Sequence, residues 1–176
     1  GQPWLMAFQA GAPHAQSRAL TAIAQAYEAM RSMPRRAEAP PAGRERAAFE
    51  RAWRLVPQGT ALVIGAALWP NWCAYPGLFA SLVTGNPVLV KPHPQAILPL
   101  ALTVEAIRAA MAAAGLPPDV VQLCVDTKEA PVARTLARSP TVKLIDYAGG
   151  PNFVRWLKTH APQARITTET RGLNPV

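Results

Sequence analysis

The chain has 176 residues, of which 50% are hydrophobic and 16% are charged. This length suffices for one hydrophobic core and is too short for two full domains. The sequence has no apolar run of about 18 residues and no basic-then-apolar leader. It therefore argues against a membrane span and a signal peptide, and we expect a cytoplasmic protein.

The two cysteines and three histidines do not predict a metal site. Cys73 and Cys124 are too few for a disulfide framework, and their spacing relative to the histidines matches no metal motif. We expect no metal and two reduced thiols, with Cys124 packed in the core.

The net charge of +8 raises the question of nucleic-acid binding, which needs Lys and Arg side chains at phosphates. Part of this charge lies in one Pro-rich stretch without interleaved aromatic residues, at Arg31, Arg35, Arg36, Arg44, Arg46, Arg51 and Arg54. This distribution favours a solvated or partner-facing loop, with attraction of a phosphorylated ligand as the alternative. We expect no nucleic-acid partner and no membrane partner.

The first predicted helix covers residues 14–33. Leu20, Ile23, Tyr27 and Met30 recur at steps of three and four, which places them on one stripe of an amphipathic helix. Prolines and a glycine in residues 34–46 break the pattern and predict a connector. A second short helix is expected at residues 46–54.

From residue 56 onward, short apolar runs alternate with helical patterns. Strands are expected at residues 60–67, 86–92, 120–125, 142–146 and 165–169, and helices at 75–84, 100–111, 131–138 and 152–160. Gly85 is a plausible helix cap. This alternation predicts an α/β fold with a doubly wound, mainly parallel sheet. We expect residues 1–55 to form an N-terminal helical and Pro/Arg-rich connecting region, and residues 56–176 the α/β unit.

Ligands of such sheets bind beyond the carboxyl ends of the strands. Lys91 follows an apolar run, where its ammonium would suit a phosphate or a ribose hydroxyl, or would simply extend into water. Gly149 and Gly150 lie between a predicted strand and a predicted helix, which suits either an anion or a tight turn. The full G-x-G-x-x-G fingerprint is absent.

Four stretches together resemble the aldehyde dehydrogenase superfamily. GNPVLVKPHP, AAGLPPDVVQL, VKLIDYAGG and TTETRGLNPV have the order and spacing of family stretches that read Gly-Asn-x-Val-Val-Leu-Lys-Pro-Ser, Ala-Gly-Leu-Pro-x-x-Val, Phe-Thr-Gly-Ser and Glu-Leu-Gly-Gly-Lys-Asn-Pro. More narrowly, LMAFQAGAPHAQSRAL and the stretch ALVIGAALWPNWCAYPGLFASLVTGNPVLVKPHPQAILPLALTV resemble its phenylacetic acid degradation branch. The resemblance implies a partial Rossmann-like domain of an enzyme that oxidises an aldehyde or CoA-linked semialdehyde with NADP or NAD.

In such an enzyme a cysteine thiolate attacks the aldehyde, hydride leaves to the nicotinamide, and a glutamate activates the water that hydrolyses the thioester. The resemblance places the nucleophilic cysteine outside this chain, so we expect the chain alone to be inactive. It begins without methionine and ends soon after Asn174-Pro175, which is typical of an excised segment. A homo-oligomer is also implied by the resemblance.

The resemblance assigns Glu169 as the general base, because Asn174-Pro175 follows at the family interval. The intervening residues 170–173 depart from Leu-Gly-Gly-Lys. Asn71 is the only amide near the position of the oxyanion donor, which in relatives often follows a tryptophan. Here Cys73 follows Trp72, so either a local shift brings Asn71 into place or that donor is lost. Cys73 itself is expected to be an incidental thiol.

For the cofactor, the resemblance assigns Lys91 to the adenosine ribose and Gly149 and Gly150 to the pyrophosphate. Pro70 and His93, in the segments that follow the first two strands of the unit, are further cofactor-binding candidates. Pro94 stands where many relatives carry a ribose-binding glutamate, and its lack of charge favours NADP over NAD. The alternative to an enzyme is a catalytically drifted scaffold that acts as an interaction module.

Overall fold

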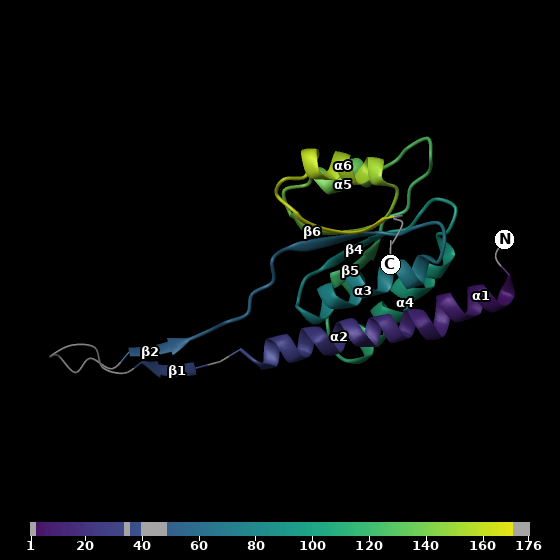
Figure 1. The fold of residues 1–176 in the computed structure, drawn as a ribbon. Helices are drawn as coiled ribbons and strands as arrows, with labels where there is room; N and C mark the ends of the chain where they lie inside the picture. The colour runs from purple at the N-terminus through teal and green to yellow at the C-terminus, as the bar shows by residue number, and fades with distance from the viewer. Residues whose placement is uncertain (1–2, 34–35, 40–48, 171–176) are drawn as a thin grey trace, which may run out of the picture.

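The computed structural model describes residues 3–33, 36–39 and 49–170. The chain starts with helix α1 (Trp4–Gln9), the π-helical turn η1 (Ala10–His14) and the long helix α2 (Ala15–Arg31). Strands β1 (Arg36–Ala39) and β2 (Phe49–Ala52) pair antiparallel and project away from the remaining elements (Figure 1). The helix expected at residues 46–54 is therefore wrong, and the connector contains a strand. Backbone pairing between β1 and β2 outweighs the helical preference of such a short segment.

The described residues from Thr60 onward form an α/β unit. Its elements are β3 (Thr60–Ile64), α3 (Pro70–Val83), β4 (Val88–Lys91), α4 (Leu98–Ala113), the 3₁₀ turn η2 (Pro118–Val120), β5 (Val121–Leu123), α5 (Ala133–Arg138), β6 (Val142–Gly149), α6 (Pro151–His160) and β7 (Arg165–Thr170). The strand order is β5-β4-β3-β6-β7, and all neighbours are parallel. The predicted fold class is confirmed.

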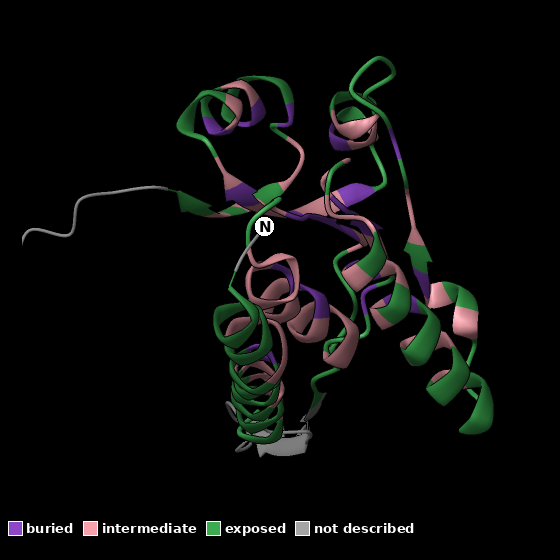
Figure 2. Ribbon diagram, turned by 90° about the vertical axis from the view of Figure 1, so that its right-hand side faces the viewer, coloured by how far each residue is buried: buried purple, intermediate pink, exposed green. Residues whose placement is uncertain are grey.

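The sheet is covered on both faces, by α3 and α4 on one and by α5 and α6 on the other (Figure 1). Successive side chains of a strand point to opposite faces. Ala61 and Val63 of β3 thus join the core beneath α3 and α4, whereas Leu62 and Ile64 join the core beneath α5 and α6. The buried residues concentrate in the strands and in the helix faces turned toward them (Figure 2).

Helix α2 packs along α3 on the outside of the sheet (Figure 1). The predicted helix is confirmed, but only part of its apolar stripe is covered: Leu20 and Tyr27 are 66% and 55% exposed, whereas Ile23 and Met30 are half-buried. Ala15 and Ala19 are buried instead. Small side chains let the two helix axes approach closely, so alanines decide which face of α2 meets α3.

The turn between α3 and β4 holds the segment that leads into β3. Gly85 has a φ of +81°, the left-handed conformation expected of a residue that follows a helix. The buried Asn86 accepts hydrogen bonds at Oδ1 from the backbone N–H groups of Gln58 (2.7 Å) and Gly59 (3.2 Å). Its amide therefore ties the chain entering β3 to the end of α3.

Among the helices of the described residues, none is long and apolar enough to cross a membrane. Within the same residues, no cluster of three or more His, Cys, Asp or Glu side chains could hold a metal ion.

Candidate functional site

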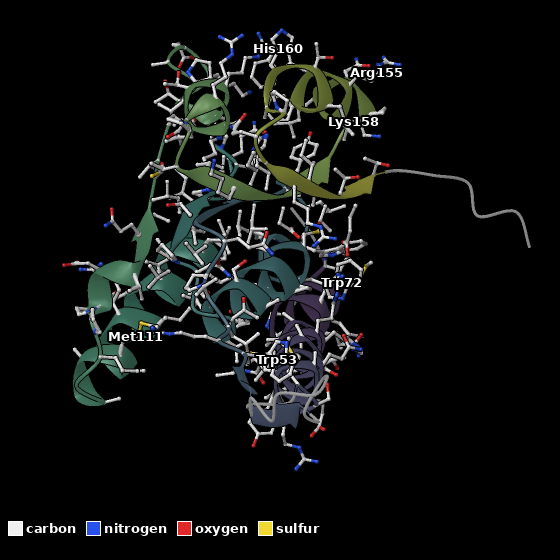
Figure 3. The ribbon with its side chains drawn as sticks, turned by 90° about the vertical axis from the view of Figure 1, so that its left-hand side faces the viewer. Trp53, Trp72, Met111, Arg155, Lys158 and His160 are labelled. Atoms are coloured by element: carbon white, nitrogen blue, oxygen red, sulfur yellow. The ribbon has the colours of Figure 1, made fainter. Side chains whose placement is uncertain are left out.

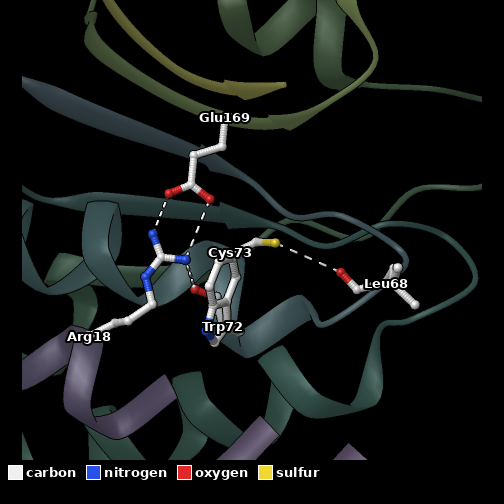
Figure 4. A network of polar contacts seen from close by, with 5 residues as sticks. All are labelled: Arg18, Leu68, Trp72, Cys73 and Glu169. Atoms are coloured by element: carbon white, nitrogen blue, oxygen red, sulfur yellow. Dashed lines mark hydrogen bonds and ion pairs between the residues drawn. The ribbon is translucent and has the colours of Figure 1, made fainter. Parts of the chain in front are cut away.

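Glu169 lies near the end of β7, beside Ala148 of β6. Its half-exposed carboxylate forms an ion pair with Arg18 of α2. Nη2 of Arg18 contacts Oε1, and Nη1 is 3.4 Å from Oε2, so both carboxylate oxygens face the guanidinium (Figure 4). The acid assigned from the sequence is thus held by a specific cation from a distant helix.

Arg18 is itself fixed by Trp72 in α3. Its Nη1 donates a hydrogen bond to the backbone oxygen of Trp72 (3.0 Å), and its guanidinium carbon lies 3.8 Å from the centroid of the Trp72 ring. Guanidinium over an indole face is a favourable cation–π contact. Three elements, α2, α3 and β7, therefore meet at one guanidinium (Figure 4). The sequence signal for Arg18, a single cation on the alanine face of α2, is recognisable only once α2 is known to pack on α3.

Cys73 follows Trp72 in α3, and its thiol is close enough to Glu169, Arg18 and Asp146 to respond to their charges. Its Sγ lies 3.8 Å from the backbone oxygen of Leu68. Burial raises the pKa of the Cys73 thiol, and the negative charges of Glu169 and Asp146 raise it further. The positive charge of Arg18 lowers this pKa and so opposes them. A raised pKa leaves little thiolate at neutral pH, which agrees with the expectation that Cys73 is not the nucleophile.

Asp146 of β6 is a second carboxyl group on the same face of the sheet. It rests against the backbone of α3 at Gly77, where an added Cβ would come within 2.4 Å of the Asp146 carboxyl carbon. Burial raises the pKa of Asp146 to about 7, with a further contribution from Glu169 that Arg18 partly offsets. The site therefore contains a carboxyl group that changes charge near neutral pH, which the sequence did not indicate.

Asn71 points away from this network. Its Nδ2 donates to the backbone oxygen of Gly11 in η1 (3.3 Å), and its Oδ1 is buried without a hydrogen-bond partner. It lies in the first turn of α3, which Pro70 opens after Trp69, a residue with a φ of 50°. Of the two alternatives for the oxyanion donor, the geometry favours the one in which Asn71 is not in place, and it is Cys73 that lies near Glu169.

Lys91, the last residue of β4, is not a free cation at the sheet edge. Its Nζ is 2.7 Å from Oδ1 of Asp126, and the two side chains are 7% and 1% exposed. Oδ2 of Asp126 also accepts the backbone N–H of Val132 (3.0 Å). The sequence offered two alternatives for Lys91, a lysine that faces a ligand or one that extends into water. Neither included Asp126, which lies in the segment after the neighbouring strand β5.

His93 lies in the loop after β4. Its Nδ1 accepts the backbone N–H of Gln95 (3.2 Å). Burial lowers the pKa of His93, the nearby Lys91 and Lys128 lower it further, and Asp126 opposes them. Because Nδ1 is the acceptor, the neutral imidazole carries its proton on Nε2, which can donate one hydrogen bond.

Gly149 ends β6 and Gly150 is the N-cap of α6. An added Cβ at Gly149 would lie 2.3 Å from the Tyr147 hydroxyl oxygen, whereas nothing lies within 4 Å of the corresponding position at Gly150. This leaves open space beside the N-terminus of a ten-residue helix, where backbone N–H groups favour anions.

Arg155, Lys158 and His160 of α6 lie across the sheet from Trp72 (Figure 3).

The model of the aldehyde dehydrogenase family matches residues 4–176. The chain belongs to the aldehyde dehydrogenase family. Among solved structures, an NAD-dependent aldehyde dehydrogenase from Burkholderia multivorans is 46% identical with a TM-score of 0.92, over 98% of this chain and 32% of that one.

Two more distant structures show the fold alone. Glyceraldehyde-3-phosphate dehydrogenase GapN from Methanocaldococcus jannaschii, in complex with NADP, has a TM-score of 0.71 at 20% identity, over 90% of this chain and 33% of that one. The NADP-dependent glyceraldehyde-3-phosphate dehydrogenase from Bacillus halodurans has a TM-score of 0.67 at 23% identity, over 89% and 32%. Among curated proteins none matches. This aldehyde dehydrogenase chain thus spans about a third of the length of these structures.

Proposed function

We propose that the chain is the cofactor-binding part of an NAD(P)-dependent aldehyde dehydrogenase, with Glu169 as its general base. The observation that carries the proposal is the placement of Glu169 near the end of β7, where its carboxylate pairs with the Arg18 guanidinium, which Trp72 of α3 holds in turn. Membership of the family supports the reaction class. Since the chain spans about a third of the solved relatives, the activity is proposed for the whole protein.

In this reaction Glu169 acts after the aldehyde carbon has become a thioester of a cysteine elsewhere in the protein. The carboxylate takes a proton from a water molecule, and the water oxygen bonds to the thioester carbon. The carbon–sulfur bond then breaks, which releases the carboxylic acid and the thiolate. Asn71 is proposed as the oxyanion donor only if its amide leaves Gly11; otherwise backbone N–H groups must supply that hydrogen bond.

The residues of this chain fit a dinucleotide at two points. The open space at Gly150 and the N-terminus of α6 suit a diphosphate, whereas at Gly149 the missing side chain makes room for the Tyr147 hydroxyl. Lys91, with His93 and Pro70 nearby along the strand ends, would hold the adenosine side, although Lys91 would do so while paired with Asp126. When bound, the nicotinamide would accept the hydride of the aldehyde.

The choice between NADP and NAD rests on opposing features. Pro94 carries no negative charge that would repel a 2′-phosphate, which favours NADP. Asp126 places a buried carboxylate at Lys91, which acts against a second anion there, and the Burkholderia multivorans relative is named as NAD-dependent. The NADP preference stays a prediction, and titration of both cofactors decides it.

For the substrate, we propose a semialdehyde, in particular a CoA-linked one from phenylacetate degradation. This finer assignment rests on the resemblance of residues 5–20 and 61–104 to the phenylacetic acid degradation protein PaaN. A cytoplasmic location and a homo-oligomer of the whole protein also stay predictions.

The direct test is formation of reduced nicotinamide by the full-length protein, with reduced thiols at neutral pH, using free aldehydes and CoA-linked semialdehydes. We expect turnover with NADP or NAD, and faster turnover with CoA-linked semialdehydes. Faster turnover of free aldehydes would contradict the CoA assignment alone. Absence of reduced cofactor with every aldehyde, together with no rise in melting temperature on adding either cofactor, would favour the interaction module instead.

A further inference from the structure

Arg18 lies outside the four stretches that resemble the family as a whole, and the sequence assigned it no role, yet its guanidinium joins α2, α3 and β7. We propose that Arg18 is a positioning residue, which fixes the Glu169 carboxylate beside Trp72 and Cys73 in the orientation needed to activate water. This inference rests on the proposed function, because it gives Arg18 a role in the same hydrolytic step.

The geometry of Arg18 suits positioning more than surface pairing. An exposed ion pair on a single helix has one contact and is worth little, as in Arg31–Glu28 at 3.5 Å. Arg18 instead faces both oxygens of Glu169, donates to the backbone oxygen of Trp72 and stacks on its ring. Its side chain is 25% exposed. A planar guanidinium held on one side by α3 can fix a carboxylate on the other side in both distance and plane.

The charges around Glu169 give Arg18 a second, measurable consequence. Arg18 faces Glu169 of β7 and Cys73 of α3. The nearby charged groups are the carboxyl group of Asp146 in β6 and the guanidinium of Arg165 at the start of β7. Arg18 lowers the pKa of both the Cys73 thiol and Asp146, whereas Glu169 raises both. The Cys73 thiol therefore reports whether Arg18 occupies this place, whatever reaction the protein catalyses.

The experiment compares full-length wild-type protein with Arg18→Met, Arg18→Lys and Glu169→Gln. Arg108→Met is the matched control, because Arg108 also pairs with a carboxylate, Asp119 (2.8 Å), and donates to backbone oxygens, but far along the sheet at β5. One readout is the pH dependence of iodoacetamide alkylation of the peptide containing Cys73, followed by mass spectrometry. The other is kcat and KM for aldehyde oxidation, with melting temperatures to show that each variant is folded.

We expect Arg18→Met to slow alkylation of Cys73 about two- to fivefold at a given pH, because the thiol loses the cation that favours thiolate. We expect kcat to fall about tenfold or more while KM changes little, as for a residue that acts in the chemical step. Arg18→Lys should restore alkylation through its charge but leave kcat low, because an ammonium cannot hold two oxygens in one plane. Arg108→Met should change neither readout.

The outcomes separate this inference from the proposed function. If the pH dependence of Cys73 alkylation in Arg18→Met equals that of the wild type, the placement of Arg18 is wrong. If Arg18→Met keeps the wild-type kcat while Glu169→Gln is inactive, only the positioning role of Arg18 is wrong. A wild-type kcat in Glu169→Gln overturns the base assignment and the positioning role with it, while the alkylation result still stands on its own.

Discussion

Lys91 and Asp126 form a buried ion pair between the end of β4 and the segment after β5. Removing one partner leaves the other charge uncompensated in a low-dielectric interior. We expect Lys91→Met to lower the free energy of unfolding by about 3–5 kcal/mol in urea titrations. The double variant Lys91→Met, Asp126→Leu should recover much of this loss, because no unpaired charge is left.

Glu28→Gln is the control for this pair, since Glu28 and Arg31 are both well exposed and 3.5 Å apart. It should change the free energy of unfolding by no more than about 0.5 kcal/mol. If Lys91→Met lowered the free energy of unfolding as little as Glu28→Gln does, the buried Asp126 carboxylate would not need Lys91 to offset its charge.

Asp146 makes stability depend on pH in an unusual direction. Its pKa is raised from 3.8 to about 7, so between these values the folded protein binds more protons than the unfolded chain. The contribution of Asp146 to stability therefore falls as the pH rises through this window. We expect Asp146→Asn to be more stable than the wild type by about 2–4 kcal/mol at about pH 8 and nearly equal to it at about pH 4.

Urea titrations across this pH range measure the effect, and Asp119→Asn, at a side chain that is 78% exposed, should leave the pH dependence of the wild type intact. A stability difference between Asp146→Asn and the wild type that does not change with pH would contradict the assignment of the raised pKa to Asp146.

At the scale of elements, Gly77 determines how closely α3 approaches the sheet. A Cβ at this position would lie 2.4–2.7 Å from atoms of Asp146. Alanine favours a helix over glycine by about 1 kcal/mol, but here the overlap forces α3 or β6 to move. We expect Gly77→Ala to destabilise the protein by about 1–3 kcal/mol in thermal or urea unfolding.

Gly11→Ala provides the comparison, because nothing lies within 4 Å of the added Cβ in η1. That substitution should be neutral or slightly stabilising. If Gly77→Ala behaved like Gly11→Ala, the close approach of α3 to Asp146 would not limit packing.

Most elements were predictable because their periodicity agrees with their packing. The strands β3 and β4 are short and mostly apolar, and Gly85 follows the end of α3 as expected. The strands β1 and β2 were not predictable, because each has only four residues and no β-branched side chain, and both owe their conformation to pairing. The packed face of α2 was also missed, since the larger Leu20 and Tyr27 suggested a stripe that the alanines replace.

At the scale of the whole molecule, the sequence located the strand ends but not the pairs that form between them. Lys91 meets Asp126 because β4 and β5 are neighbours, and Glu169 meets Arg18 because α2 packs on α3. Such contacts join residues 35 and 151 positions apart, so no local pattern contains them. The remaining segment around Asn174-Pro175 lies outside the described residues.

The most direct measurement is a rapid-mixing assay of full-length Glu169→Gln with aldehyde and cofactor. If Glu169 activates water only for hydrolysis of the thioester, hydride transfer still occurs once. We predict a burst of about one equivalent of reduced nicotinamide per active site, followed by turnover at least about a hundredfold slower than the wild type. Steady turnover of Glu169→Gln at the wild-type rate would contradict the account.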